Sequence, residues 1–126
     1  MTTPIEIVDP VMSVSRGVDG VVRVRWEPGT AITEDAARRS IELVQNVSGG
    51  HKRLLLVDMS EVKSMTRESR NVYAGNDSML ALALVGQSPV VRVIANFALN
   101  LHPPSVPTKF CTSVAEAETW LDGFPR

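Results

Sequence analysis

Residues 53–69, RLLLVDMSEVKSMTRES, contain an unbroken apolar run that ends at an aspartate and is followed by a polar turn. The run Leu54–Val57 has the length of a strand and lacks polar alternation, which is typical of a strand covered on both faces of a sheet. Thr66 then places a hydroxyl where a helix N-cap needs one. This strand–turn–helix unit predicts an α/β protein in which residues 54–57 form a central strand.

The segment before this strand predicts a β-hairpin. Apolar and polar residues alternate over Val11–Arg16 and again over residues 22–26. Asp19-Gly20 lies between the two runs, and both of its residues tolerate the positive φ angles of a tight hairpin turn. Residues 1–10 are expected to form a loose N-terminal arm.

A first helix is predicted between the hairpin and the central strand. Thr33 is its expected N-cap, followed by two carboxylates that suit the positive end of the helix dipole, and Gly49-Gly50 ends it. Its inner face is predicted to carry Ala37, Ile41, Val44 and Val47.

The segment after the central strand continues the alternation of helix and strand. After the helix capped by Thr66, a strand is expected over Leu80–Val85, a third helix opens at Ser88-Pro89, and a short strand lies around Lys109–Thr112. A capping-box sequence, Ser113-Val-Ala-Glu116, starts the last helix. Its inner face is predicted to carry Ala117, Trp120 and Leu121. The order ββαβαβαβα predicts an α/β domain over residues 11–126, with a mixed sheet of about five strands, one of them antiparallel, and about four helices.

Composition excludes several classes of function. The chain has 13 basic and 14 acidic side chains, so no strong field draws it to nucleic acid, and six aromatic residues (3 Phe, 2 Trp and 1 Tyr) offer little stacking surface for bases. The first residues lack a basic segment and an apolar segment of signal-peptide type, and the longest apolar stretch, Val90–Leu101, is too short and too polar to cross a bilayer. Cys111 is the single cysteine, which excludes an internal disulfide. We therefore expect a cytoplasmic protein without nucleic-acid binding or membrane insertion.

The turn after the central strand resembles the signature of the STAS, or SpoIIAA-like, family of anti-sigma-factor antagonists. In that family an apolar strand ends in Asp-Leu-Ser, then come a glycine, a valine, two residues, an apolar residue and Asp-Ser-Ser-Gly. Four positions of this chain match it: Asp58, Ser60, Val62 and Met65. The resemblance implies a SpoIIAA-like fold, and more distant SEC14-like lipid carriers are compatible with the same element order.

The same comparison places a different residue where the family carries its phosphorylated serine. Thr66 lies at the aspartate position, Arg67 at the first serine, Glu68 at the phosphorylated serine and Ser69 at the glycine. Glu68 has no hydroxyl, and its fixed charge is a weak mimic of a phosphoserine. The family's serine switch is therefore not expected at this position, while Thr66 and Ser69 keep a shifted acceptor open.

Polar side chains are expected to gather at the carboxyl edge of the parallel strands, where open α/β sheets bind ligands. A candidate partner or ligand rim consists of Asp58, Ser60, Thr66, Arg67, Glu68, Arg70, Gln87 and Ser88, with Thr112 and Ser113 close by. The alternative interpretation is that the hydroxyl residues among them only cap helices.

The expected third helix is apolar around most of its circumference. Only Arg92, Asn96 and Asn100, spaced by four, form a polar stripe, and Phe97 lies on the apolar face. Such a helix needs cover on more than one side. A second subunit, an apolar ligand or the neighbouring helix each provide that cover, so a homodimer, a ligand site and a plain core position all stay open.

Catalytic chemistry has no support in the sequence. His51 and His102 lie far apart without metal-ligand spacing, and nothing supplies a base for Cys111. We expect no metal and no cofactor. The leading hypothesis is a non-enzymatic regulatory domain, homodimeric, that meets a protein partner through residues 60–70; the alternative is a carrier of a small apolar or anionic molecule.

Overall fold

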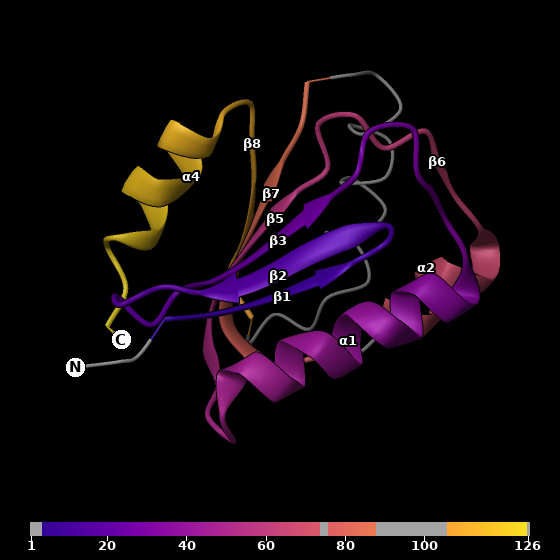
Figure 1. The fold of residues 1–126 in the computed structure, drawn as a ribbon. Coiled ribbons are helices and arrows are strands. Elements are labelled where there is room, and N and C mark those ends of the chain that lie inside the picture. Colours follow the sequence, from indigo (N-terminus) through magenta and orange to yellow (C-terminus); the bar gives the residue numbers. More distant parts are fainter. Residues whose placement is uncertain (1–3, 74–75, 88–105, 126) are drawn as a thin grey trace.

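The computed structural model describes residues 4–73, 76–87 and 106–125 and consists of one large mixed sheet with helices on both faces. The strands are β1 Ile5–Asp9, β2 Met12–Arg16, β3 Val22–Trp26, β4 Ala31–Ile32, β5 Arg53–Asp58, β6 Ser64–Met65, β7 Met79–Val85 and β8 Thr108–Cys111. The described helices are α1 Glu34–Ser48, α2 Arg67–Tyr73 and α4 Val114–Leu121. Helices α1 and α2 cover one face of the sheet, and α4 covers the other (Figure 1). The predicted α/β class is confirmed, and the third predicted helix lies outside the described residues.

The large sheet has six strands in the order β1-β2-β3-β5-β7-β8. Strands β3, β5, β7 and β8 run parallel to one another, as predicted. Strand β2 pairs antiparallel with both β1 and β3, so it alone runs opposite to the other five strands, and the expectation of one antiparallel strand is confirmed. The sheet has six strands where about five were predicted.

The additional strand is β1, which occupies half of the segment expected to be a loose arm. Val8 is 74% exposed and Ile5 is 38% exposed, so this edge strand lacks the burial that gives a strand a clear hydrophobic pattern. Asp9 ends it with a turn, because its carboxylate accepts the backbone N–H of Val11. The same carboxylate forms an ion pair with Arg39 of α1, which ties the edge of the sheet to the helix below it.

The predicted helix caps are confirmed at three positions. The side-chain oxygens of Thr33, Thr66 and Ser113 each accept the backbone N–H three residues further on, at 3.2, 3.1 and 3.1 Å. The capping box is only half formed. Glu116 accepts the N–H of Thr112 at 3.0 Å rather than that of Ser113, so its bond reaches one residue beyond the cap.

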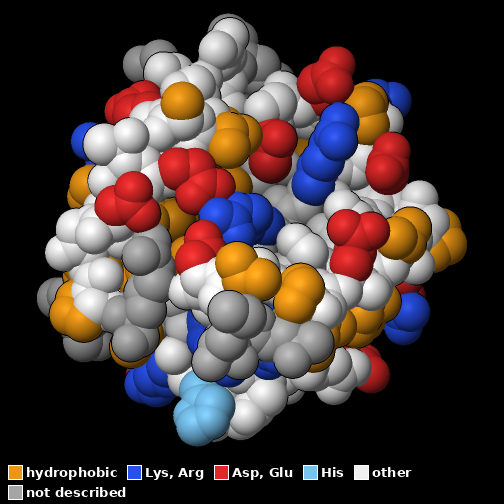
Figure 2. Space-filling model, turned by 60° about the vertical axis from the view of Figure 1, so that its left-hand side comes forward, with side chains coloured by type: hydrophobic (Ala, Val, Ile, Leu, Met, Phe, Trp, Pro, Cys, Tyr) orange, Lys and Arg blue, Asp and Glu red, His pale blue; other side chains and the backbone are white. Residues whose placement is uncertain are grey.

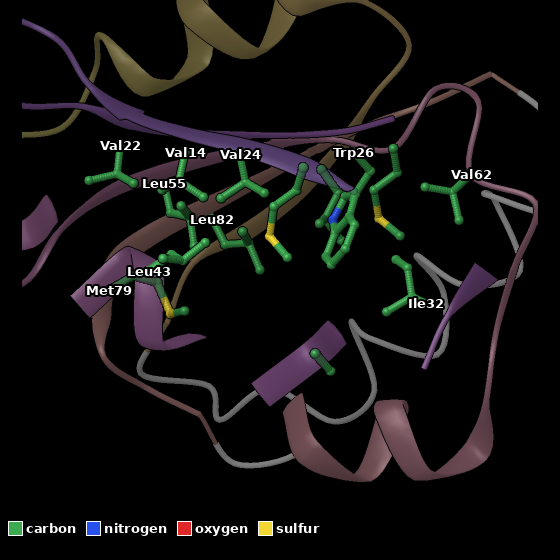
Figure 3. Close-up of a cluster of buried hydrophobic side chains, with 14 of the residues drawn as sticks. Val14, Val22, Val24, Trp26, Ile32, Leu43, Leu55, Val62, Met79 and Leu82 are labelled. Atoms are coloured by element: carbon green, nitrogen blue, oxygen red, sulfur yellow. The ribbon is translucent and has the colours of Figure 1, made fainter. Parts of the chain in front are cut away.

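Strand β5 separates two apolar clusters, one on each face of the sheet. Leu54 and Leu56 point toward α4, while Leu55 belongs to the cluster shared with α1 and α2. In the cluster that contains Leu55, Trp26 projects from β3 toward helices α1 and α2 (Figure 3). The prediction of a central strand covered on both faces is thus confirmed.

A bidentate ion pair ties α4 to the sheet on its own face. Arg23 donates from Nε and Nη2 to the two carboxylate oxygens of Glu118, at 2.8 and 2.9 Å. Asp19, in the hairpin turn, accepts from the same guanidinium at 3.1 Å. The surface on this side of the molecule, where α4 lies, carries acidic and basic side chains side by side, with hydrophobic side chains between them (Figure 2).

Candidate functional site

The carboxyl ends of three parallel strands lie in register, and they bring part of the predicted rim together. Asp58 of β5 pairs with Val85 of β7, which pairs with Cys111 of β8. Just beyond these ends, the Gln87 side-chain amide donates to the carbonyl of Thr112 at 2.7 Å. Asp58, Gln87 and Thr112 therefore share one edge of the sheet.

Asp58 at this edge is already engaged with its neighbour. Its Oδ1 accepts the backbone N–H of Ser60 at 3.0 Å and the Ser60 hydroxyl at 2.5 Å, forming a local turn. These contacts join Asp58 to Ser60, which is also a residue of the predicted rim. Ser88, also predicted for the rim, lies outside the described residues, as do Arg92, Asn96, Phe97 and Asn100 of the expected third helix.

Thr66, Arg67 and Glu68 lie in a second group, at the start of α2. The short strands β4 and β6 pair in parallel, with Ile32 opposite Met65, and the N–H of Thr66 donates to the carbonyl of Ile32 at 3.0 Å. Thr33 and Thr66 follow directly on this pairing, so the N-caps of α1 and α2 begin side by side. The hydroxyl oxygen of Thr66 accepts the N–H of Ser69, so the observed role of Thr66 is that of a helix N-cap.

The residues that replace the family's phosphorylated segment differ sharply in exposure. Arg67 and Glu68 are exposed, whereas Ser69 is fully buried. The Ser69 hydroxyl donates to the carbonyl of Thr66 at 2.7 Å. Of the two hydroxyls that could serve as a shifted phosphoacceptor, that of Ser69 is therefore enclosed and that of Thr66 is half-buried, while the exposed Glu68 beside them is a carboxylate.

A cavity of about 100 Å³ lies between the sheet and helices α1 and α2. Its sheet side includes Trp26, Leu55 and Leu82, and its helix side includes Ile41 and Val44 of α1. Trp26 and Leu82 project from the sheet on this side in Figure 3. The wall is therefore mainly apolar, and a molecule in this space meets aliphatic and aromatic side chains on both sides.

A few polar side chains also line the cavity. Ser40 of α1 and Tyr73 of α2 meet there, with their hydroxyl oxygens 2.5 Å apart. Asn76 and Ser78 are joined to each other, because the Ser78 hydroxyl donates to the Asn76 side chain at 2.8 Å. Arg70 also lines the cavity and has an interaction of its own within the protein. The Ser40–Tyr73 pair is thus where two helices present hydroxyls to an otherwise apolar wall.

Two further features bear on chemistry. Among residues 4–73, 76–87 and 106–125, no three His, Cys, Asp or Glu side chains come close enough to hold a metal ion. Cys111 is buried, and burial raises the pKa of its thiol, so little of it is the reactive thiolate at neutral pH.

Within the same described part of the chain, no helix has the length and apolar character required to span a membrane.

The sequence model of DUF7793, described as a domain of unknown function, matches residues 15–125. The chain belongs to the DUF7793 family. Comparison with curated proteins gives no match.

Two solved structures are similar to this DUF7793 chain. One is an uncharacterized protein of the DUF3478 family with a SpoIIAA-like fold, from Shewanella loihica PV-4; it is 15% identical, with 96% of this chain and 98% of that chain covered and a TM-score of 0.63. The other is a protein with unknown function from Arthrobacter sp. FB24; it is 36% identical, with 88% and 92% covered and a TM-score of 0.35. The first likeness confirms the SpoIIAA-like fold that the turn after β5 predicted.

The cavity of this DUF7793 domain was not predicted from its sequence. The predicted inner face of α1 was Ala37, Ile41, Val44 and Val47, but its buried residues are Ala37, Ser40, Leu43, Val47 and Ser48. Ile41 and Val44 border the cavity instead, and Ser40 of the same helix also lines it. The one available signal was Ser40, a small polar residue three positions after Ala37 on a helix face expected to be apolar.

Tyr73 is the single tyrosine of this DUF7793 chain, so the pKa of its hydroxyl can be measured without a signal from other tyrosines. Burial raises the pKa of Tyr73 to about 12, against an ordinary value of 10.0, while the contact with Ser40 lowers it. Because Tyr73 ionises first in the unfolded chain, we expect its contribution to the free energy of unfolding to be constant below pH 10 and to fall as the pH rises from 10 toward 12. Absorbance of tyrosinate during a pH titration checks the midpoint, and a native midpoint near 10 contradicts the prediction.

Proposed function

We propose that this DUF7793 chain is a non-enzymatic domain that binds a small, mainly apolar molecule between its sheet and helices α1 and α2. The supporting observation is the cavity of about 100 Å³ with its apolar wall. A molecule of matching size makes dispersion contacts with the side chains of this wall and removes its own apolar surface from water, and both effects favour binding.

The size and lining of the cavity limit the ligand to about one ring. Apolar cavities of about 150 Å³ engineered in another protein stay dry and bind benzene. The present volume is of that order, and its lining includes Trp26 and aliphatic side chains. This supports the second of the two functions expected from the sequence, in its apolar form.

Toluene is a suitable probe for this proposal. At ten times its dissociation constant, a ligand of the folded state adds about 1.4 kcal/mol of stability, which corresponds to a rise of about 4 °C in Tm. Binding is also expected to change the emission of Trp26, measured with Trp120→Phe so that only the tryptophan lining the cavity reports.

Two variants give matched controls for the toluene experiment. Val44→Phe places a ring in the cavity and is expected to abolish the response without lowering Tm, while Val8→Phe adds the same ring at a site that is 74% exposed and should leave the response intact. The proposal fails if the native protein shows no response, or if a solution structure finds the space filled by the chain's own residues.

A protein-interaction role is our second proposal, and the exposure of Arg67 and Glu68 at the start of α2 favours it. Neither residue caps the helix, so both are available to a partner, either a second copy of the chain or a different protein. Glu68→Lys reverses an exposed charge away from the cavity wall. If partner binding depends on Glu68 and the native protein does not bind toluene, this proposal is favoured over the first.

A further inference from the structure

The hydroxyls of Ser40 and Tyr73 meet in the wall of the cavity, and the direction of their hydrogen bond follows from a count of protons. A serine hydroxyl has one proton to donate. Ser40 donates it to the carbonyl of Ala37 at 2.7 Å, one turn back along α1. In the 2.5 Å contact between the two hydroxyls, Tyr73 is therefore the donor and Ser40 the acceptor.

This arrangement decides what Tyr73 offers to the cavity. Its only proton is turned toward Ser40, but its oxygen keeps the capacity to accept a hydrogen bond. A molecule in the cavity that carries an O–H or N–H group can satisfy that oxygen. A molecule that carries only an acceptor, such as an ether or ketone oxygen, receives no hydrogen bond from the Tyr73 hydroxyl in this arrangement.

We infer that the cavity selects a small apolar ligand with one hydrogen-bond donor, of the phenol or short-alcohol class, whose O–H donates to the Tyr73 oxygen. This inference rests on the proposed function and adds the polar group that the ligand carries. Of the other polar residues in the wall, Asn76 accepts from Ser78 through its side-chain oxygen, and Arg70 has an interaction within the protein. The ligand's O–H is assigned to Tyr73 because the Tyr73 oxygen can accept while its own proton is directed to Ser40.

Three probes of nearly equal size separate shape from hydrogen bonding: toluene, phenol and anisole. Differences in hydration between probes cancel when the affinity of each probe relative to toluene is compared between a variant and the native protein. Tyr73→Phe in a Ser40→Ala background removes both hydroxyls, so phenol cannot turn to Ser40 instead. We expect phenol to weaken about five- to tenfold relative to toluene in this double variant, the usual scale of one hydrogen bond.

Ser40→Ala alone provides a test with the opposite sign. It removes the acceptor that holds the Tyr73 proton, so the phenolic O–H is free to turn into the cavity. Anisole, which only accepts, is then expected to gain severalfold relative to toluene. A merely structural role for Ser40 predicts equal changes for all three probes.

The outcomes distinguish this inference from the proposed function on which it rests. If toluene binds and neither ratio changes in the two variants, the cavity binds ligands but the donor selection is wrong. If no probe binds the native protein, the proposed function itself fails and the inference falls with it. If all three probes weaken equally, the hydroxyl pair only supports the wall, and the inference is again overturned.

Discussion

Replacing Ser69 by aspartate is expected to lower the free energy of unfolding by about 3–5 kcal/mol, the usual cost of an uncompensated buried charge. Ser69 is completely buried, and its hydroxyl donates to the carbonyl of Thr66. An ionised carboxylate at this position cannot donate to that carbonyl and instead faces its oxygen. Such a loss is a large part of the total stability of a small domain.

The matched control places the same carboxylate three residues earlier. Thr66→Asp is expected to keep stability within about 0.5 kcal/mol, because aspartate is a good N-cap and can accept the N–H of Ser69 as the threonine does. Urea unfolding of both variants measures the contrast. Equal midpoints for Ser69→Asp and the native protein would show that the site opens readily.

This contrast also bears on phosphorylation. The Ser69 hydroxyl would reach a kinase only if the first turn of α2 opened, because the side chain has no exposed surface. Glu68, which is exposed, already places a negative charge on that turn. The fixed charge of Glu68 and the enclosed hydroxyl of Ser69 are the reasons to expect no serine switch at these two positions.

The local signals of the sequence predicted most of the helix starts and the central strand. Thr33, Thr66 and Ser113 act as caps because a hydroxyl followed by helical residues meets its N–H partner within the same few residues. The run 54–57 predicted its own burial on both faces, since no polar residue interrupts it. These features depend on neighbours along the chain, so one sequence suffices to find them.

Features that depend on distant neighbours were missed. Strands β4 and β6 have two residues each, which is too few to show an alternating pattern. They form because Ile32 pairs with Met65, a residue distant in the sequence. Strand β1 has exposed apolar side chains, so its pattern predicted an arm. The cavity arises from how α1 and α2 lie over the sheet, and the contact of Ser40 with Tyr73 joins residues 33 positions apart.

Leu121→Ala is expected to cost about 3–4 kcal/mol and to lower Tm by about 10 °C or more, as for other buried leucines in tight surroundings. Leu121 is the last residue of α4 and is fully buried in the cluster that holds Leu54, Ala81 and Cys111. Alanine and cysteine side chains are short, so they cannot move in to fill the space that the leucine leaves. The loss is therefore expected in the upper half of the usual range.

Val114→Ala is the control on the same helix, and it decides what the loss at Leu121 means. Val114 is 43% exposed and is the first residue of α4, so its truncation removes little buried surface and slightly favours the helix. We expect its free energy of unfolding to stay within about 0.5 kcal/mol of the native value. Thermal unfolding of both variants tests whether α4 holds the sheet through Leu121. If Leu121→Ala is as stable as Val114→Ala, the helix is dispensable for the fold, and the Arg23–Glu118 pair would mark a surface contact rather than the edge of a second core.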